Sequence, residues 1–206
     1  MDWLDVYEPS APVPAAAVLL LHGSGPNERD VIAPLANELT GLGAVILAPD
    51  WDVHSDDLAG RLGAAAEQAV RFAATRQIRR LVVAGWSAGG SAALWLSCSQ
   101  PATFSRLALI ATSLQPIPAL RPAAAHIVET VFVTGSADHI VPAADSQTAI
   151  AELRASGYRV SHVVVDADHA GVIQTEFDET RQRCRPSSDP AVLEAGGITA
   201  RSILGL

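Results

Sequence analysis

Residues 81–90, Leu-Val-Val-Ala-Gly-Trp-Ser-Ala-Gly-Gly, decide the fold. The apolar run Leu81–Ala84 predicts a short buried strand, and the alanine-rich residues that follow Ser87 predict a helix directly after it. A serine between a strand and a helix must sit in a sharp, strained turn, where side chains two positions away on either side would collide. Glycine occupies both of those positions, as Gly85 and Gly89. The stretch therefore predicts a G-x-S-x-G nucleophile elbow, which presents the hydroxyl of Ser87 above a sheet.

Short apolar runs recur along the chain and alternate with helical patterns. Most are apolar at every position, which is typical of parallel strands buried on both faces. This alternation predicts an α/β fold with a mostly parallel sheet of about six to seven strands and helices on both faces. The predicted strands are Leu4–Tyr7, Val18–Leu21, Ala44–Ala48, Leu81–Ala84, Arg106–Ala111, Thr130–Val133 and Ser161–Val165. The predicted helices are Val31–Leu42, one that Ser55 caps and that runs through Phe72, Ala88–Ser99, Ala143–Ser156 and Ala191–Leu206.

Length and composition bound the domain organisation. The chain has 206 residues, of which 49% are hydrophobic and 17% charged, enough for one domain with its own core. We expect a single domain over residues 1–206 that uses nearly the whole chain, and hence no substantial cap domain. The proline- and alanine-rich connection Gln115–Ala125 is the only one with room for a lid. We expect Glu176–Arg185 to be a solvated charged stretch, and Arg185–Pro190 a loop.

Charge excludes several classes of function. All 14 basic residues are arginine, so chemistry that requires a lysine amine is excluded, including Schiff-base, pyridoxal, P-loop and Ser–Lys enzymes. The net charge of −8 argues against nucleic acid as a partner. No apolar run approaches the roughly 18 residues of a membrane span, and the acidic first residues do not resemble a signal peptide. We therefore expect a soluble, cytoplasmic protein with no membrane partner.

The two cysteines, Cys98 and Cys184, belong to no CxxC or Cys/His ligand pattern. We expect no metal and no cofactor. A disulfide between them is conceivable, but a chain without a secretion signal is not expected to form one.

A serine hydroxyl needs a base and the base needs an orienting carboxylate. Among the six histidines, His169 follows the last predicted strand, at the end of a parallel sheet where reactive groups gather. Asp138 follows the preceding predicted strand in the same way. We expect catalytic roles for Ser87, Asp138 and His169.

An oxyanion needs N–H donors beside the serine. The glycine-rich loop His22–Gly25 follows a central predicted strand and can turn a backbone N–H toward Ser87. We expect the oxyanion hole to be formed by the N–H groups of Ser24 and Ala88. His22 is expected to brace this loop rather than to react.

In chain order these pieces are the oxyanion loop, serine, aspartate and histidine, and the chain resembles the α/β-hydrolase fold family over nearly its whole length. It is most similar to the compact carboxylesterase and dienelactone-hydrolase-like branch. Serine replaces the cysteine nucleophile of dienelactone hydrolases proper, and the chain lacks the long insertion of lidded lipases between Ser87 and Asp138. The resemblance is carried by Leu20–Gly25, Asn27, Gly85–Gly89, Gly135–Pro142 and Asp168-His169.

The resemblance implies hydrolysis of carboxylic esters through an acyl-enzyme, with a small or exposed ester as the partner molecule. A thioesterase or acyltransferase with the same triad, and a non-catalytic hydrolase-like binding module, are the alternatives. Four further residues are candidates for lining the substrate pocket, with ordinary packing as the open alternative: Trp51, His54, Trp86 and Leu114.

Overall fold

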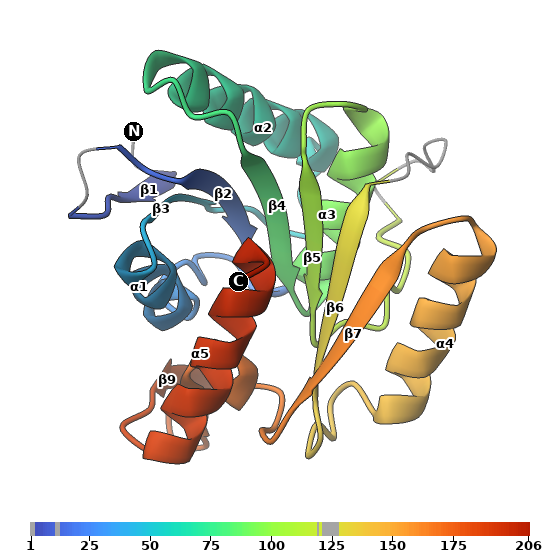
Figure 1. Ribbon diagram of the computed structural model, residues 1–206. Coiled ribbons are helices and arrows are strands. Elements are labelled where there is room, and N and C mark those ends of the chain that lie inside the picture. The colour runs from blue at the N-terminus through green and yellow to red at the C-terminus, as the bar shows by residue number, and fades with distance from the viewer. Residues whose placement is uncertain (1–2, 11–12, 119, 121–127) are drawn as a thin grey trace.

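A seven-stranded sheet forms the middle layer of the computed structural model, which describes residues 3–10, 13–118, 120 and 128–206. Its strands are β1 (Leu4–Tyr7), β2 (Ala16–Leu21), β3 (Ala44–Pro49), β4 (Leu81–Trp86), β5 (Arg106–Ile110), β6 (Glu129–Gly135) and β7 (Val160–Val165). Their order is β1-β3-β2-β4-β5-β6-β7 (Figure 1). β1 pairs antiparallel with β3, and all the other neighbouring pairs in this sheet are parallel. The α/β fold with a mostly parallel sheet is confirmed.

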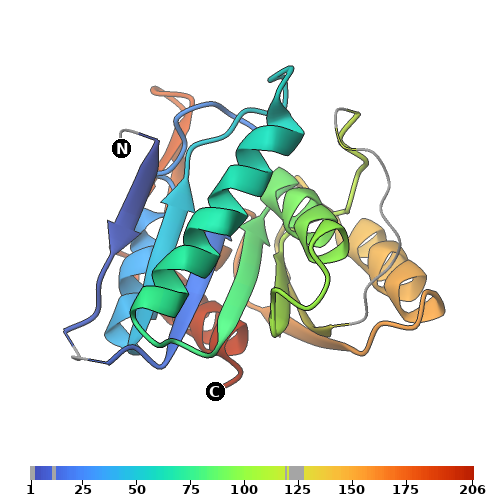
Figure 2. The ribbon, with the colours of Figure 1, turned by 90° about the horizontal axis from the view of Figure 1, so that it is seen from above.

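Helices cover both faces of this sheet (Figure 2). One face carries α2 (Leu58–Thr75), α3 (Ala88–Ser99) and α4 (Ala143–Ala155), and the other carries α1 (Ala33–Gly41) and α5 (Pro190–Leu204). Successive side chains of a strand point to opposite faces, so each strand feeds both halves of the core. In β2, Leu19 and Leu21 pack on the side of α2 and α3, whereas Val18 and Leu20 pack on the side of α1 and α5.

The parallel register brings the loops that follow the strands to one edge of the sheet. Leu21 at the end of β2 lies beside Gly85 in β4, and Gly135 at the end of β6 lies beside Val165 in β7. The loops that carry Ser24, Ser87, Asp138 and His169 therefore leave the sheet at the same edge, because parallel strands end on the same side.

Residues 175–186 differ from the expectation of a solvated stretch and a loop. β8 (Thr175–Asp178) and β9 (Arg183–Pro186) form an antiparallel hairpin, preceded by a 3-10 turn over Gly171–Ile173. In register, Glu176 lies opposite Arg185 and Asp178 opposite Arg183, so opposite charges face each other across the hairpin. That charge pairing stabilises strands whose composition is otherwise polar.

Two smaller expectations are settled by the described residues. Cys98 on α3 and Cys184 on β9 are both free thiols, so the disulfide left open by the sequence does not form. α2 starts at Leu58, with Asp57 rather than Ser55 at the N-cap. The connection expected to have room for a lid lies partly outside the described residues, at 119 and 121–127.

Among the described residues, no helix combines the length and apolar character needed to cross a membrane.

Candidate active site

Ser87 occupies a strained turn between β4 and α3. Its backbone angles are φ 56° and ψ −124°, far from those of a strand or a helix, and its N–H donates to the Ile110 carbonyl oxygen at 2.9 Å. A Cβ added at Gly85 would lie 1.9 Å from the Gly89 carbonyl oxygen, and one at Gly89 would lie 2.4 Å from the His22 carbonyl oxygen. Both glycines are therefore required by backbone contact, as the elbow pattern predicts.

Asp138 and His169 form a hydrogen-bonded pair on the loops after β6 and β7. His169 Nδ1 lies 2.8 Å from Asp138 Oδ2, and Asp138 Oδ1 accepts the N–H groups of Ile140 and Val141 at 2.9 and 2.8 Å. Burial alone would raise the pKa of Asp138, but the hydrogen bonds from His169, Val141 and Ile140 outweigh it and hold this pKa below its ordinary value. The ionised carboxylate can only accept, so Nδ1 of His169 donates to it and Nε2 is left without a bond to Asp138.

Trp86 holds His169 against the elbow. The indole Nε1–H donates to the His169 carbonyl oxygen at 2.9 Å, and the two ring centroids are 5.0 Å apart. Trp86 directly precedes Ser87, so the base and the serine lie on neighbouring backbone segments. No hydrogen bond joins Ser87 to His169 in the described part of the chain; such bonds are often long before a substrate is bound.

The two expected oxyanion donors are the N–H groups of Ser24 and Ala88. Ser24 is exposed in the loop after β2, and Ala88 is the first residue of α3, where helix N–H groups have no intrahelical partner. Neither N–H donates a hydrogen bond to another described residue. Both donors are therefore free for a ligand.

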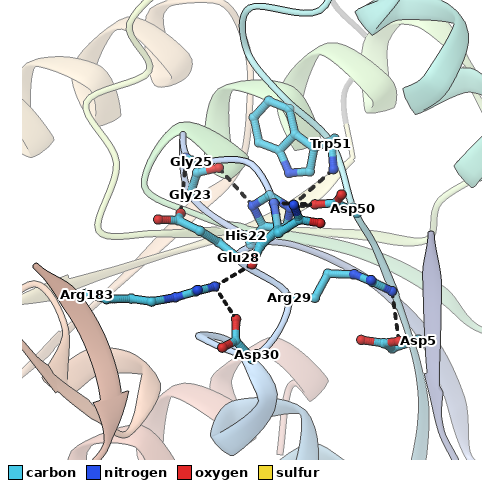
Figure 3. Close-up of polar contacts among 11 residues, drawn as sticks. Asp5, His22, Gly23, Gly25, Glu28, Arg29, Asp30, Asp50, Trp51 and Arg183 are labelled. Atoms are coloured by element: carbon cyan, nitrogen blue, oxygen red, sulfur yellow. Dashed lines mark hydrogen bonds and ion pairs between the residues drawn. The ribbon is translucent and has the colours of Figure 1, made fainter. Parts of the chain in front are cut away.

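His22 braces the oxyanion loop from below, as Figure 3 shows. The fully buried imidazole donates from Nδ1 to the Gly23 carbonyl oxygen at 3.0 Å and accepts the Trp51 N–H at Nε2 at 3.3 Å. Burial lowers the pKa of His22 by more than the Gly23 carbonyl and the nearby Asp50 and Glu28 carboxylates raise it. The ring is neutral, and the expected bracing role agrees with this geometry.

Side chains from three other places hold the same loop (Figure 3). Glu28 Oε2 accepts the Gly25 N–H at 3.1 Å, and Asp50 Oδ1, after β3, accepts the Asn27 N–H at 2.8 Å. Arg183 on β9 donates to the Asn27 carbonyl oxygen and to the Asp30 carboxylate. The sequence analysis missed Arg183, because it lies 153 residues from Asp30 and nothing local marks the contact.

A cavity of about 640 Å³ opens beside Ser87. Its walls come from the elbow and α3, the loop after β3, which includes His54, the loop after β5, and Val141. Leu114 lines an adjoining cavity of about 220 Å³ that shares Ser91 and Ile117 with the first. Of the expected pocket residues, His54 therefore lines the main cavity, and Leu114 its extension.

Two of the expected pocket residues lie elsewhere, which corrects the prediction. Trp51 is only 1% exposed and packs in the core with β2, β3 and α2. Trp86 is 6% exposed and packs against His169 instead of facing the main cavity. At the end of a strand, packing decides which way a side chain points. The position of Trp51 or Trp86 in the sequence does not reveal that direction.

Across residues 3–10, 13–118, 120 and 128–206, no three His, Cys, Asp or Glu side chains gather where they could hold a metal ion.

The sequence matches no protein-family model and no curated protein. The structure is similar to those of an esterase from Pyrobaculum calidifontis (TM-score 0.71, 18% identity, covering 98% of this chain and 80% of that one) and an alpha-beta serine hydrolase homologue from Coxiella burnetii (0.63, 17%, 81% and 82%). A third is a thermophilic esterase from Thermogutta terrifontis with propionate bound (0.68, 19%, 96% and 85%). At these identities the likeness shows the fold, which is the α/β-hydrolase fold.

Replacing Gly89 by alanine should destabilise the protein, because the new Cβ would meet the carbonyl oxygens of Leu21 and His22 at 2.5 and 2.4 Å. We expect a loss of about 3 kcal/mol or more in the free energy of unfolding, or no folded protein. Gly63→Ala on α2 is the matched control, because nothing lies within 4 Å of the added Cβ, and it should gain about 0.5–1 kcal/mol. Urea denaturation measures both. Equal midpoints for Gly89→Ala and the wild type would contradict the elbow geometry.

The lowered pKa of His22 predicts that stability falls in mild acid. The unfolded chain takes up a proton at its ordinary pKa of about 6.5, whereas the folded protein does not, so the stabilisation is complete above that pH and is lost below it. We expect His22→Gln to remove a slope of up to about 1.4 kcal/mol per pH unit between pH 6.5 and 5. Urea unfolding at several pH values measures it, with His139→Gln at an exposed site as the control. An unchanged slope in His22→Gln would refute the assignment.

Removing Arg183 should loosen the oxyanion loop. In Arg183→Ala the amides of Gly25 and Asn27 are expected to exchange with deuterium about three- to tenfold faster, as a partly exposed charge-assisted contact is lost. Arg181→Ala, in the turn of the same hairpin, is the control and should leave these amides unchanged. Equal exchange in the two variants would mean that Arg183 does not hold the loop.

Proposed function

We propose that the chain is a serine hydrolase that cleaves small or exposed carboxylic esters through an acyl-enzyme. The carrying observation is the strained Ser87 turn, which opens on a cavity of about 640 Å³, together with the hydrogen-bonded Asp138–His169 pair that the preceding residue, Trp86, contacts. A cavity of this size lies within the range of about 300–1,000 Å³ usual for small-molecule sites. A serine held at φ 56° and ψ −124° beside such a cavity is the kind of strained residue that is often found at active sites.

In the first half of the reaction, Ser87 Oγ attacks the carbonyl carbon of the ester and its proton passes to Nε2 of His169. The carbonyl oxygen becomes an anion and accepts the N–H groups of Ser24 and Ala88, each worth about 3 kcal/mol of transition-state stabilisation. Asp138, kept ionised by its hydrogen bonds, stabilises the imidazolium. His169 then returns the proton to the leaving oxygen, the C–O bond breaks, and the alcohol departs from an acyl group on Ser87.

In the second half, His169 takes a proton from water, which attacks the acyl carbon. The resulting oxyanion collapses, the bond to Ser87 Oγ breaks, and His169 protonates the serine as the carboxylic acid leaves. Every proton moves between Ser87, His169, water and the substrate, so these steps use no metal or cofactor.

The similar structures support an ester as the substrate. Two of the three are esterases, and the one from Thermogutta terrifontis holds propionate, which is the acid product of a short acyl ester. A thioester presents the same carbonyl group to Ser87. Turnover rates of matched esters and thioesters therefore decide whether the leaving atom is oxygen or sulfur.

Ser87→Ala should abolish the hydrolysis of p-nitrophenyl acetate and labelling by a fluorophosphonate, because no other group can form the acyl-enzyme. We expect kcat to fall by about 10³- to 10⁶-fold, and Asp138→Asn to lower it by about 10⁴-fold. Ser91→Ala is the matched control, since Ser91 lines the same cavity without a contact to His169 or Asp138, and it should still be labelled.

Three outcomes separate the alternatives. Faster turnover of acetyl thioesters than of the matching esters would favour a thioesterase. A folded wild-type protein that takes no label and turns over neither substrate class would favour a binding module. Full activity in Ser87→Ala would rule out the acyl-enzyme.

A further inference from the structure

A second cavity, of about 300 Å³, lies beside His169 and is separate from the one at Ser87. It is built from three segments: the loop after β6, the loop after β7, and the β8–β9 hairpin. Five of the eight described residues that line it are apolar, namely Ala137, Ile140, Ala170, Phe177 and Cys184, and the other three are His139, Asp168 and His169. Nothing in the mechanism above uses this cavity.

Two large apolar side chains at this cavity are held out in solvent. Ile140 is 72% exposed and Phe177 is 53% exposed. Isolated exposed apolar residues are ordinary, but here one on the loop after β6 and one on β8 wall the same largely apolar cavity, as the side chains of a ligand site do. The hairpin register places Phe177 opposite Cys184, so both side chains face the same side of the hairpin.

The Asp138–His169 pair separates the two cavities. Ile140 and Val141 both donate their N–H groups to Asp138 Oδ1, yet Val141 lines the cavity at Ser87 and Ile140 lines the second one. The loop that carries Asp138 therefore contributes to the walls of both cavities, and His169 belongs to the wall of the second.

The reaction determines which half of an ester points each way. In the tetrahedral intermediate, the oxyanion faces Ser24 and Ala88, and the leaving oxygen faces the base that must protonate it. The acyl chain then takes the remaining direction, into the cavity lined by Ser87 and Ala88 and not by His169. The group attached to the leaving oxygen extends past His169 toward the second cavity.

We propose that the second cavity binds the alcohol portion of the ester, and that Phe177 and Ile140 make it selective for an uncharged, apolar alcohol. This inference rests on the proposed esterase function. Asp168 lines the cavity beside His139 and His169, its described lining residues include no arginine, and the chain carries a net charge of −8, so an alcohol that bears a carboxylate or phosphate is disfavoured. The ligand class is a simple alkyl or aryl alcohol.

The test compares ethyl, n-butyl and n-hexyl acetate, which share one acyl group and have leaving alcohols of similar acidity. In the wild type, kcat/KM should rise by up to about three- to fourfold for each methylene group that becomes buried. In Phe177→Ser/Ile140→Ser the ratio of kcat/KM for hexyl over ethyl acetate should fall at least tenfold, and Phe177→Leu should keep most of it. Val70→Ser, an exposed apolar residue on α2, is the control and should keep the whole ratio.

A binding measurement keeps this inference separate from the proposed function. Titration of the ¹⁵N-labelled protein with 1-hexanol should shift the amide signals of Phe177, Cys184 and Ala170, and the double variant should lose these shifts. If the double variant still hydrolyses the esters and keeps the wild-type preference for hexyl acetate, the proposed subsite is wrong and the proposed esterase function is unaffected. If no ester is turned over, the proposed esterase function is wrong. If 1-hexanol also leaves these amide signals unshifted, the proposed alcohol subsite is wrong as well.

Discussion

The site depends on the close contact between the start of α3 and the end of β2. At Gly89 only a hydrogen fits, because the carbonyl oxygens of Leu21 and His22 would lie 2.5 and 2.4 Å from a Cβ. This contact brings the turn of Ser87 against the glycine-rich loop after β2, so Ser87 and Ser24 lie on neighbouring segments that are far apart in sequence. Any larger residue at position 89 would separate the elbow from the loop before it affected the serine itself.

A glycine-rich loop has little stiffness of its own, so the order of the oxyanion loop must come from its surroundings. His22 holds it from the core as a neutral, fully buried imidazole, and Asp50 holds it from the end of β3. Glu28 and Arg183 hold it from the loop itself and from the hairpin. Preorganised N–H donors stabilise a developing anion without rearrangement during the reaction, which is the physical reason for anchoring so short a segment at several points.

The parts of this arrangement that repeat a local rule could be predicted from the sequence. Buried parallel strands appear as continuous apolar runs that end at one edge of the sheet, so the positions of Ser87, Asp138 and His169 at that edge could be predicted without a structure, while their catalytic roles stay predictions. Trp51 could not, since packing alone turned its ring into the core. The hairpin was missed because its strands have only four residues each, two of them charged, although these charges alternate with Phe177 and Cys184 in the period of two that marks a strand.

That period of two also explains how one short hairpin can serve two places. Adjacent residues of a strand project to opposite faces, so Arg183 and Cys184 on β9 point away from each other. Arg183 donates to Asn27 and Asp30, which follow the oxyanion loop in the chain. Cys184 and Phe177 both line the cavity beside His169. The opposite charges of Glu176 and Arg185, 2.6 Å apart, hold the two strands in the register that this division requires. The hairpin thus contacts the segment that follows the glycine-rich loop and also forms part of the wall of the second cavity, although it contributes no residue to the Ser87, Asp138 and His169 set.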